Sequence, residues 1–246
     1  GAVRQAGLAA ERTAAVRHGR LMFRTACAWL FCLTAGAAGA ADYRAGPNDY
    51  RGYLNRLQAG DRLLLEPGDY LRGLPLHNLS GLPAKPIVIE AANPIAPPRF
   101  VARAGANTVS LVNVRHIALR HLELDGGNVP VDAIKAEGHS RYADFITLEN
   151  LDIHDHGASQ QNVGISTKCP TFGWVVRGNR IERVGTGMYF GDSDGSDPFV
   201  AGLIEENRVV GIRLVDQGVG KSGEAAESFS PGMDIRAALT VVGDGP

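Results

Sequence analysis

The chain has 246 residues, of which 44% are hydrophobic and 21% are charged, enough apolar material for one domain with a substantial core and no need for a second. The formal net charge at neutral pH is −1, with acidic and basic residues interspersed. This balance gives no electrostatic footprint for nucleic acid, so we expect no nucleic-acid partner.

Residues 22–41 have the pattern of a secretory signal peptide. Arg24 follows Met22, an apolar stretch too short for a comfortable membrane span comes next, and an Ala-Gly-Ala cleavage site ends at Ala40. We therefore expect a periplasmic or secreted protein without a membrane span after signal removal. Residues 1–21 are then expected to be a non-native, disordered upstream extension translated from too early a start. The alternative is a disordered or helical N-terminal extension.

The segment NDYRGYLNRLQAGD predicts a short amphipathic helix. Asn48 is a suitable N-cap, and Tyr50, Tyr53, Leu54 and Leu57 follow helical spacing. A helix at this place would cover the open first coil of a repeat protein. Strands are expected next, around residues 63–65 and 87–89.

Between residues 114 and 211 the chain repeats itself at a spacing of 28 to 29 residues. Short runs with period-two alternation predict strands, and a period of this size indicates stacked coils that bury their faces against their neighbours. We therefore expect an all-β fold, a single-stranded parallel β-helix over 47–211. A leucine-rich repeat is the rival, but its dense leucine signature is missing. The three registers of the repeat are Leu119, Leu148, Val176 and Ile204; Leu124, Ile153, Ile181 and Val209; and Leu122, Leu151, Asn179 and Asn207.

The dipeptides at residues 149–150, 178–179 and 206–207 lie at the same point of each repeat, where two strands meet at a bend. Asparagine tolerates left-handed backbone angles, and its amide can bond with an identical amide one coil away. Stacked asparagines, Asn179 on Asn207, favour parallel coils in register.

One further strand per coil can be recognised in VDAIKAEG, NVGISTKC and GTGMYFGD. If Ile134, Ile165 and Met188 point inward, the alternation sends Asp132 inward too, where it is a poor fit, and leaves two outward stripes. The stripes are Lys135, Ser166 and Tyr189, and Glu137, Lys168 and Gly191.

After residue 211 the pattern decays, and the remaining segment is rich in Gly, Asp and Glu. We expect residues 212–246 to be an irregular tail. It is either a disordered end or an end that has been truncated or shifted in reading frame.

Three short motifs follow the expected helix: AGD at residues 59–61, PGDY at 67–70 and PIVI at 86–89. This outline resembles the opening of secreted right-handed parallel β-helix proteins of the pectate-lyase-like family, notably polysaccharide lyases related to chondroitinase B and alginate lyase. With the coils, the resemblance covers about residues 50–211. It implies the pectin lyase fold and a polysaccharide partner. The catalytic Lys and Arg and the calcium carboxylates of these lyases have no matching motifs here, and the segment 154–157 differs from the DPHD signature of related epimerases.

Cleavage of a uronate polymer by β-elimination needs a base for the proton next to the carboxylate, and a cation or hydrogen bonds that neutralise that carboxylate. Lys135, Lys168 and Tyr189 could supply the base and the clamp. The alternative is that they are ordinary solvated side chains.

Two further groups of residues are candidates for a metal site or for catalysis. Asp192, Asp194 and Asp197 surround a Gly turn and could hold Ca²⁺, although the spacing departs from the EF-hand pattern and a solvated turn needs no metal. His154 and His156 could supply a base or a metal site, but they share a face only if the strand continues, and a turn with incidental histidines explains them equally well.

Our leading interpretation is an exported protein that acts on acidic polysaccharide as a lyase. The alternative is a non-catalytic carbohydrate-binding or envelope-associated β-helix protein. A glycoside hydrolase on the same fold ranks third, with Asp192 and Asp194 as its pair of carboxylates.

Overall fold

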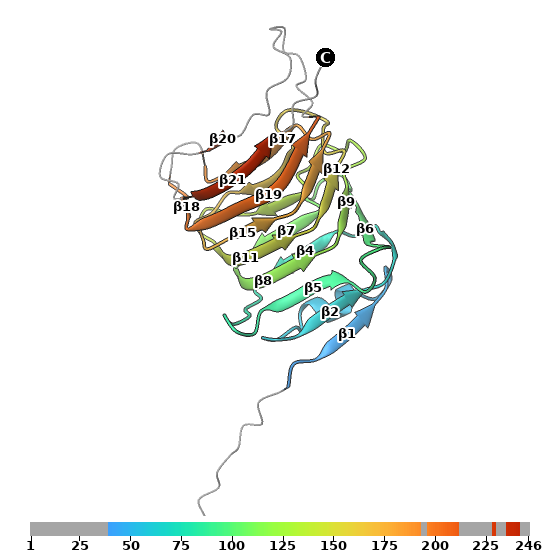
Figure 1. Ribbon diagram of the computed structural model, residues 1–246. Helices are drawn as coiled ribbons and strands as arrows, with labels where there is room; N and C mark the ends of the chain where they lie inside the picture. Colours follow the sequence, from blue (N-terminus) through green and yellow to red (C-terminus); the bar gives the residue numbers. More distant parts are fainter. Residues whose placement is uncertain (1–38, 193–195, 212–227, 230–234, 242–246) are drawn as a thin grey trace, which may run out of the picture. The chain divides into compact units, whose positions relative to one another are not determined.

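Parallel strands stack in successive coils through the part of the chain that the computed structural model describes, residues 39–192, 196–211, 228–229 and 235–241 (Figure 1). The expected extension at 1–21, most of the expected signal peptide and Asp194 lie outside these residues. No helix among the described residues has the length and apolar character needed to cross a bilayer.

The coils present three faces, and strand β19 belongs to two of them because it pairs with β15 through its first half and with β16 through its second. The first face consists of β1 (Asp42–Ala45), β2 (Arg62–Leu65), β5 (Ile87–Ala91), β8 (Val114–Arg120), β11 (Ala143–Glu149), β15 (Val175–Arg177) and β19 (Gly202–Val210). The second face consists of β3 (Gly68–Tyr70), β6 (Pro98–Val101), β9 (Glu123–Asp125), β12 (Asp152–His154), β16 (Arg180–Glu182) and the end of β19. The third face consists of β4 (Leu74–His77), β7 (Val109–Val112), β10 (Ile134–Ala136), β13 (Val163–Thr167), β17 (Thr186–Phe190) and β20 (Ser228–Phe229).

The registers expected from the repeat are confirmed. Leu148 pairs with Leu119 on one side and Val176 on the other, and Val176 pairs with Ile204. The second register pairs in the same way around Ile153, and the four residues of the third are buried. The chain is therefore an all-β, right-handed parallel β-helix with a short N-terminal helix, as predicted.

The asparagine stack is present inside the solenoid. Asn179 Nδ2 donates to Asn207 Oδ1 at 2.8 Å and to the Leu148 carbonyl at 3.0 Å, and Asn179 Oδ1 accepts from the Leu151 amide at 2.9 Å. Asn207 Nδ2 donates in turn to the Val176 carbonyl at 2.8 Å. Each amide therefore satisfies backbone groups of the preceding coil that the bend leaves without a strand partner.

At the first of these bends asparagine itself is left-handed, as expected, whereas at the next two the left-handed residue stands one position before the asparagine. Asn150, Gly178 and Glu206 have φ values of 54°, 64° and 57°. The side chains of Asn179 and Asn207 must point inward to reach the next coil, so the turn itself is made by the residue before each of them.

The N-terminal helix α1 (Arg51–Leu54) is shorter than its sequence pattern. Its N-cap is Tyr50 rather than Asn48, and no side chain caps it. The Tyr50 ring is buried against Tyr70 and Phe100, at centroid distances of 5.0 and 5.9 Å. This aromatic group covers the first coil as expected.

The described residues beyond 211 form two strands. β20 pairs with β17, and β21 (Ile235–Val241) pairs with β19, with Ala237 opposite Ile204. The rest of the segment 212–246 lies outside the described residues.

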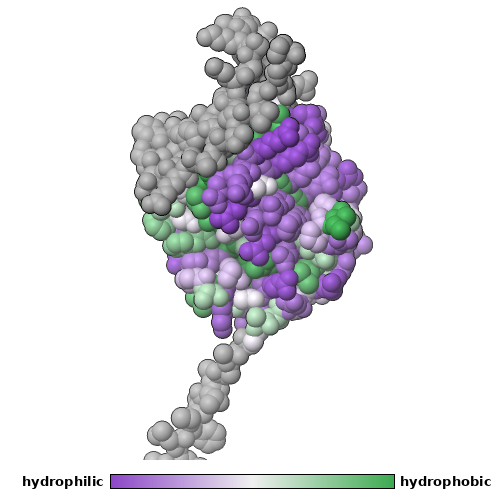
Figure 2. Space-filling view, viewed as in Figure 1, coloured by the Kyte–Doolittle hydropathy of each residue, from purple (hydrophilic) through white to green (hydrophobic). Residues whose placement is uncertain are grey.

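Ion pairs between neighbouring coils cover the outside of the first two faces. Arg62 lies 2.6 Å from Glu90, Arg120 lies 3.0 Å from Glu149, and Arg177 contacts Glu205. Hydrophilic residues accordingly cover much of the first face (Figure 2). Each exposed pair contributes little to stability, but opposite charges on adjacent rungs favour this register over a shifted one.

We expect Asn179→Ala to lower the free energy of unfolding by about 2–4 kcal/mol, because it leaves buried backbone groups at Leu148 and Leu151 without a partner. Urea denaturation followed by circular dichroism measures the change. The control is Asn48→Ala at an exposed position, which should change the free energy of unfolding by less than about 0.5 kcal/mol. Equal midpoints for the two variants would contradict a structural role for the stack.

Candidate functional site

The third face carries a row of outward side chains along its strands. Lys135 pairs with Ser166, and Ser166 pairs with Tyr189. The row continues toward the N-terminal helix, since Lys135 pairs with Ser110 and Ser110 with Pro75. Neighbouring rungs are about 4.8 Å apart, so the row places one residue on each successive coil at regular intervals.

The alternation predicted that Asp132 points inward, and this prediction is wrong. Asp132 lies on the outer side of the third face. Its Oδ2 is 3.0 Å from Lys135 Nζ and accepts a hydrogen bond of 3.3 Å from Ser166 Oγ, while its Oδ1 accepts from the Val163 amide at 2.9 Å. The strand begins only at Ile134, so the period of two does not extend back to residue 132. The buried carboxylate of Asp132 forms an ion pair with Lys135, whose side chain is 30% exposed, and Ser166 is buried beneath the pair.

Lys168, which follows β13 and lies outside the row, contacts Tyr189 of the row. Lys168 Nζ lies 3.6 Å from the centroid of the Tyr189 ring, a cation–π geometry. Burial lowers the pKa of Lys168, and the nearby Lys135 ammonium lowers it further. A partly buried lysine of lowered pKa is neutral more often near neutral pH and can serve as a base. The structure thus brings Lys135, Lys168 and Tyr189 together.

The carboxylates of Asp192 and Asp197 are close enough to Lys168 to act on its charge, and they are only 6% and 3% exposed. Asp192 Oδ2 accepts from Ser196 Oγ at 2.8 Å and its Oδ1 from the Asp197 amide at 3.1 Å. His139, which we did not single out from the sequence, contacts Asp197 through Nδ1 and lies 3.9 Å from Asp192. His139 and Asp197 are 58 residues apart in the sequence, so no local motif predicts that they are in contact.

Two carboxylates and an imidazole within 4.8 Å of one another could hold a metal ion. Ca²⁺, however, takes about six to eight oxygen ligands, whereas this set includes a nitrogen donor that suits a transition metal better. The described residues therefore do not by themselves fit calcium. Since Asp194 lies outside them, the Ca²⁺ site of Asp192, Asp194 and Asp197 stays a prediction.

The structure separates His154 from His156. His154 ends β12 on the second face, with Nδ1 2.7 Å from Asp155 Oδ2 and Nε2 3.3 Å from Glu123 Oε1. Asp155 has a φ of 59° and turns the chain, so His156 lies buried with Nδ1 3.1 Å from the Val131 carbonyl.

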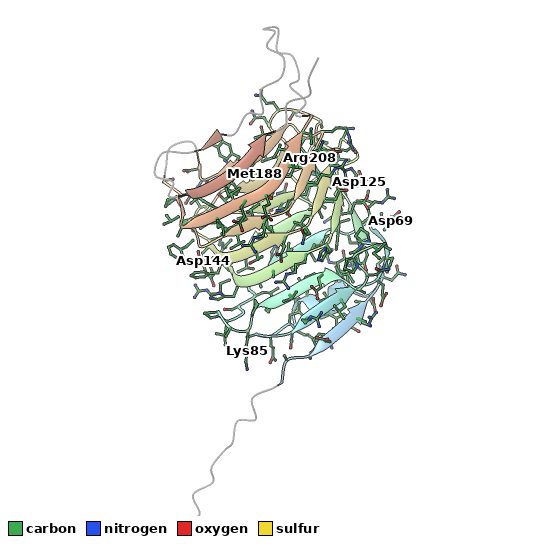
Figure 3. All side chains as sticks on the ribbon, viewed as in Figure 1. Asp69, Lys85, Asp125, Asp144, Met188 and Arg208 are labelled. Carbon is green, nitrogen blue, oxygen red and sulfur yellow. The ribbon has the colours of Figure 1, made fainter. Side chains whose placement is uncertain are left out.

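The two histidines also differ in charge. Burial disfavours the charged form of His154, but its hydrogen bonds with Asp155 and Glu123 outweigh it and raise the pKa. Burial lowers the pKa of His156. His154 therefore joins a network of ion pairs that includes Asp125, which Figure 3 labels on the side of β9 and β12. Neither histidine joins the row of Lys135.

An exposed aromatic stack is the feature that sequence reasoning missed most clearly. The His116 and Phe145 rings stack at 4.5 Å with an angle of 8°, and Phe172 meets Phe145 edge-on at 5.3 Å. Phe145 and Phe172 are 40% and 46% exposed. A Cβ at Gly173 would lie 2.7 Å from the Phe145 ring, so the stack requires glycine there. The one available signal was that His116 and Phe145 are a single repeat apart.

The fold defines the class of this chain as a parallel β-helix protein with an ionisable row on its third face. No family model matches it. Among curated proteins it is 37% identical over 68 residues to the mitochondrial electron transfer flavoprotein-ubiquinone oxidoreductase of Arabidopsis thaliana, a match over 28% of this chain and 10% of that protein. The chain thus spans about a tenth of the length of the curated relative.

Three solved structures are similar at low identity. A GH136 lacto-N-biosidase from Eubacterium ramulus shares 15% identity over 71% of this chain and 52% of its own, with a TM-score of 0.44. An alginate lyase from Paenibacillus sp. str. FPU-7 shares 12% over 69% and 76%, with a TM-score of 0.40. A PL6 family alginate lyase shares 13% over 69% and 32%, with a TM-score of 0.44. These likenesses carry no argument about activity, which must come from the side chains.

We expect His154→Gln to destabilise the protein most at acid pH. The folded pKa of His154 is raised, so its contribution is fully present below the unfolded value of about 6.5 and is lost as the pH rises through the folded value. Thermal midpoints of both proteins between pH 5.5 and 8 measure this. A difference that stays constant or grows with pH would contradict the ion-pair role.

Proposed function

We propose that this protein acts on acidic polysaccharide as a lyase that cleaves a uronate polymer by β-elimination. The observation that carries the proposal is the contact of Lys168 with the Tyr189 ring, 3.6 Å from Nζ to centroid. It combines Lys168, a lysine of lowered pKa, with the phenol of Tyr189, which belongs to the outward row of the third face. Lys168 can act as a base and Tyr189 as a second proton carrier, at a place where a polymer could lie across the strands.

In β-elimination a base removes the proton next to the substrate carboxylate, the bond to the leaving glycosidic oxygen breaks, and a carbon–carbon double bond forms. Neutral Lys168 takes the proton, and the Tyr189 hydroxyl donates one to the leaving oxygen. Negative charge develops on the substrate carboxylate, and the ammonium of Lys135 stabilises it from the neighbouring coils. Atoms and charge balance without an oxidant or reductant.

The spacing of the row suits this assignment. Lys135 and Tyr189 lie two rungs apart, about 9.6 Å along the stack, a gap that a sugar ring with its carboxylate could span. Ser166 lies between them and is buried, so the substrate would rest on the Asp132–Lys135 pair.

We expect Tyr189→Phe and Lys168→Met each to lower turnover on a uronate polymer by roughly 10²- to 10⁴-fold, because both remove a group that acts in the transition state. Tyr189→Phe keeps the ring beneath Lys168, so it isolates the hydroxyl. Ultraviolet absorbance of the unsaturated products measures turnover across a panel of uronate polymers. The matched control is Arg208→Gln at an exposed position on β19, which should retain full activity.

Unchanged turnover in both variants would remove this row as the active site. If the unmodified protein is inactive on every polymer but still binds one, the alternative of a non-catalytic carbohydrate-binding protein is favoured. The exposed rings of Phe145 and Phe172 favour that alternative, since aromatic faces are apolar surfaces against which a sugar ring can pack. The glycoside hydrolase alternative depends on Asp194, which lies outside the described residues.

The pH dependence provides a separate test. Turnover should rise with pH as Lys168 loses its proton. Lys135→Ala removes an ammonium that lowers the pKa of Lys168, so the rising limb of the profile should move to higher pH whatever the absolute rate. A limb that stays in place or moves to lower pH would exclude Lys168 as the base.

We also propose that the protein is exported and begins at Ala41 after cleavage. The backbone nitrogen of Ala41 lies 2.9 Å from Asp61 Oδ1, and Asp61 is buried. Cleavage after Ala40 would turn that nitrogen into an ammonium group and so add an opposite charge beside the carboxylate, which supports the site. The other carboxylate oxygen of Asp61, Oδ2, accepts a hydrogen bond from the Gln58 amide at 2.8 Å.

Sequencing of the N-terminus of protein recovered from the periplasm or culture fluid should find Ala41 or Asp42 as the first residue. Recovery of exported protein with residues 22–40 intact would contradict cleavage. Recovery in the cytoplasm alone would contradict export.

A further inference from the structure

A pocket of about 510 Å³ lies at the end of the third face that is next to helix α1. Three of its lining residues are arginines from separate segments: one in α1, one between β3 and β4, and one after β6. The residues that matter for its chemistry are Arg51, Arg72, Arg103, Pro75, Ser110 and Glu137.

The positive charge of this pocket is not neutralised within the described part of the chain. No carboxylate there lies within ion-pairing distance of Arg51, Arg72 or Arg103, and Arg51 Nη1 donates to the backbone carbonyl of Arg72 at 3.0 Å. The acidic lining residue, Glu137, accepts a hydrogen bond of 2.9 Å from Asn107 Nδ2. On the first two faces, by contrast, several arginines are paired with Glu or Asp of a neighbouring coil: Arg62, Arg99, Arg120 and Arg183.

The three guanidinium groups converge on one region. The Tyr50 hydroxyl donates to the Gly73 carbonyl. Burial raises the pKa of Tyr50, and the positive charges of all three arginines act in the opposite direction and lower this pKa. A pocket lined by several positive charges favours the binding of an anion.

The pocket is continuous with the proposed active site. Ser110 and Pro75 line it, and they belong to the outward row in which Ser110 pairs with Lys135. Ser110 and Tyr189 are three rungs apart, about 14 Å. A group in the pocket must therefore belong to a different sugar unit from the one between Lys135 and Tyr189.

We propose that this pocket is a subsite for the anionic group of a neighbouring sugar in the same polymer, which rests on the proposed function. The shared chemistry of the ligand is an anion on a sugar ring, either a uronate carboxylate or a sulfate ester. Guanidinium groups bind both through paired N–H donors. The subsite selects polymers that carry charge on successive units, and it sets the minimum length that binds well.

Isothermal titration calorimetry with oligosaccharides of defined length tests this subsite. Uronate oligomers, sulfated oligomers of neutral sugars and uncharged oligomers form the three arms. The double variant Arg72→Gln/Arg103→Gln removes two positive charges from the pocket. The control, Arg208→Gln, removes one positive charge from β19, away from the pocket. Thermal midpoints verify that both variants are folded.

For the unmodified protein, affinity should increase with oligomer length until the pocket is filled. The double variant should bind the long charged oligomer roughly tenfold or more weakly while keeping its affinity for the shortest. Arg208→Gln should change neither. The difference should shrink as salt is added, and the arm that shows it identifies carboxylate or sulfate as the group bound.

Equal affinity of the double variant and the unmodified protein for the long charged oligomers would overturn the subsite alone. Failure of the unmodified protein to bind any charged oligomer would overturn the proposed function and the subsite with it. An uncharged oligomer that shows the same loss would overturn the anionic selectivity.

Discussion

Each coil of this solenoid has its hydrogen-bond partners and its apolar neighbours in the coils directly before and after it. A residue at a given point of one coil therefore has the same neighbours as its equivalent in the next, and the side chains at that point must be compatible in size and polarity. Leu119, Leu148, Val176 and Ile204 meet this condition with aliphatic groups. Asn179 and Asn207 meet it with amides that bond to each other and to the preceding backbone. The outward row of the third face inherits its regular spacing from the same constraint.

The parts of this structure that the sequence predicts are those that recur at the repeat spacing. Period-two alternation and the recurrence of Ile134, Ile165 and Met188 were sufficient to align Lys135 with Ser166 and Tyr189. The parts that it does not predict come from residues outside the strands. Asp132 precedes its strand, so alternation gave it the wrong side.

Contacts between loops explain most of what remained. His139 and Asp197 lie in separate loops. Arg72 and Arg103 follow the paired strands β3 and β6 but at positions that are not equivalent in register, and Arg51 lies in α1 outside the repeat. The aromatic stack depends on positive φ angles at His116 and Phe145, which are local conformations that composition does not reveal. The sequence thus predicts the scaffold and the row, whereas the chemical surroundings of the row depend on the folded loops.

The amide stack also bears on how a protein of this kind can change during evolution. Because Asn179 bonds to Asn207 and to the backbone at Leu148 and Leu151, substitution of one member removes partners from two coils at once. Duplication of a whole coil, by contrast, brings a new asparagine together with the backbone groups that it serves. Such a solenoid can therefore grow or shorten by entire coils more readily than it can vary the interior of one, and each added coil would lengthen the outward row by one further position.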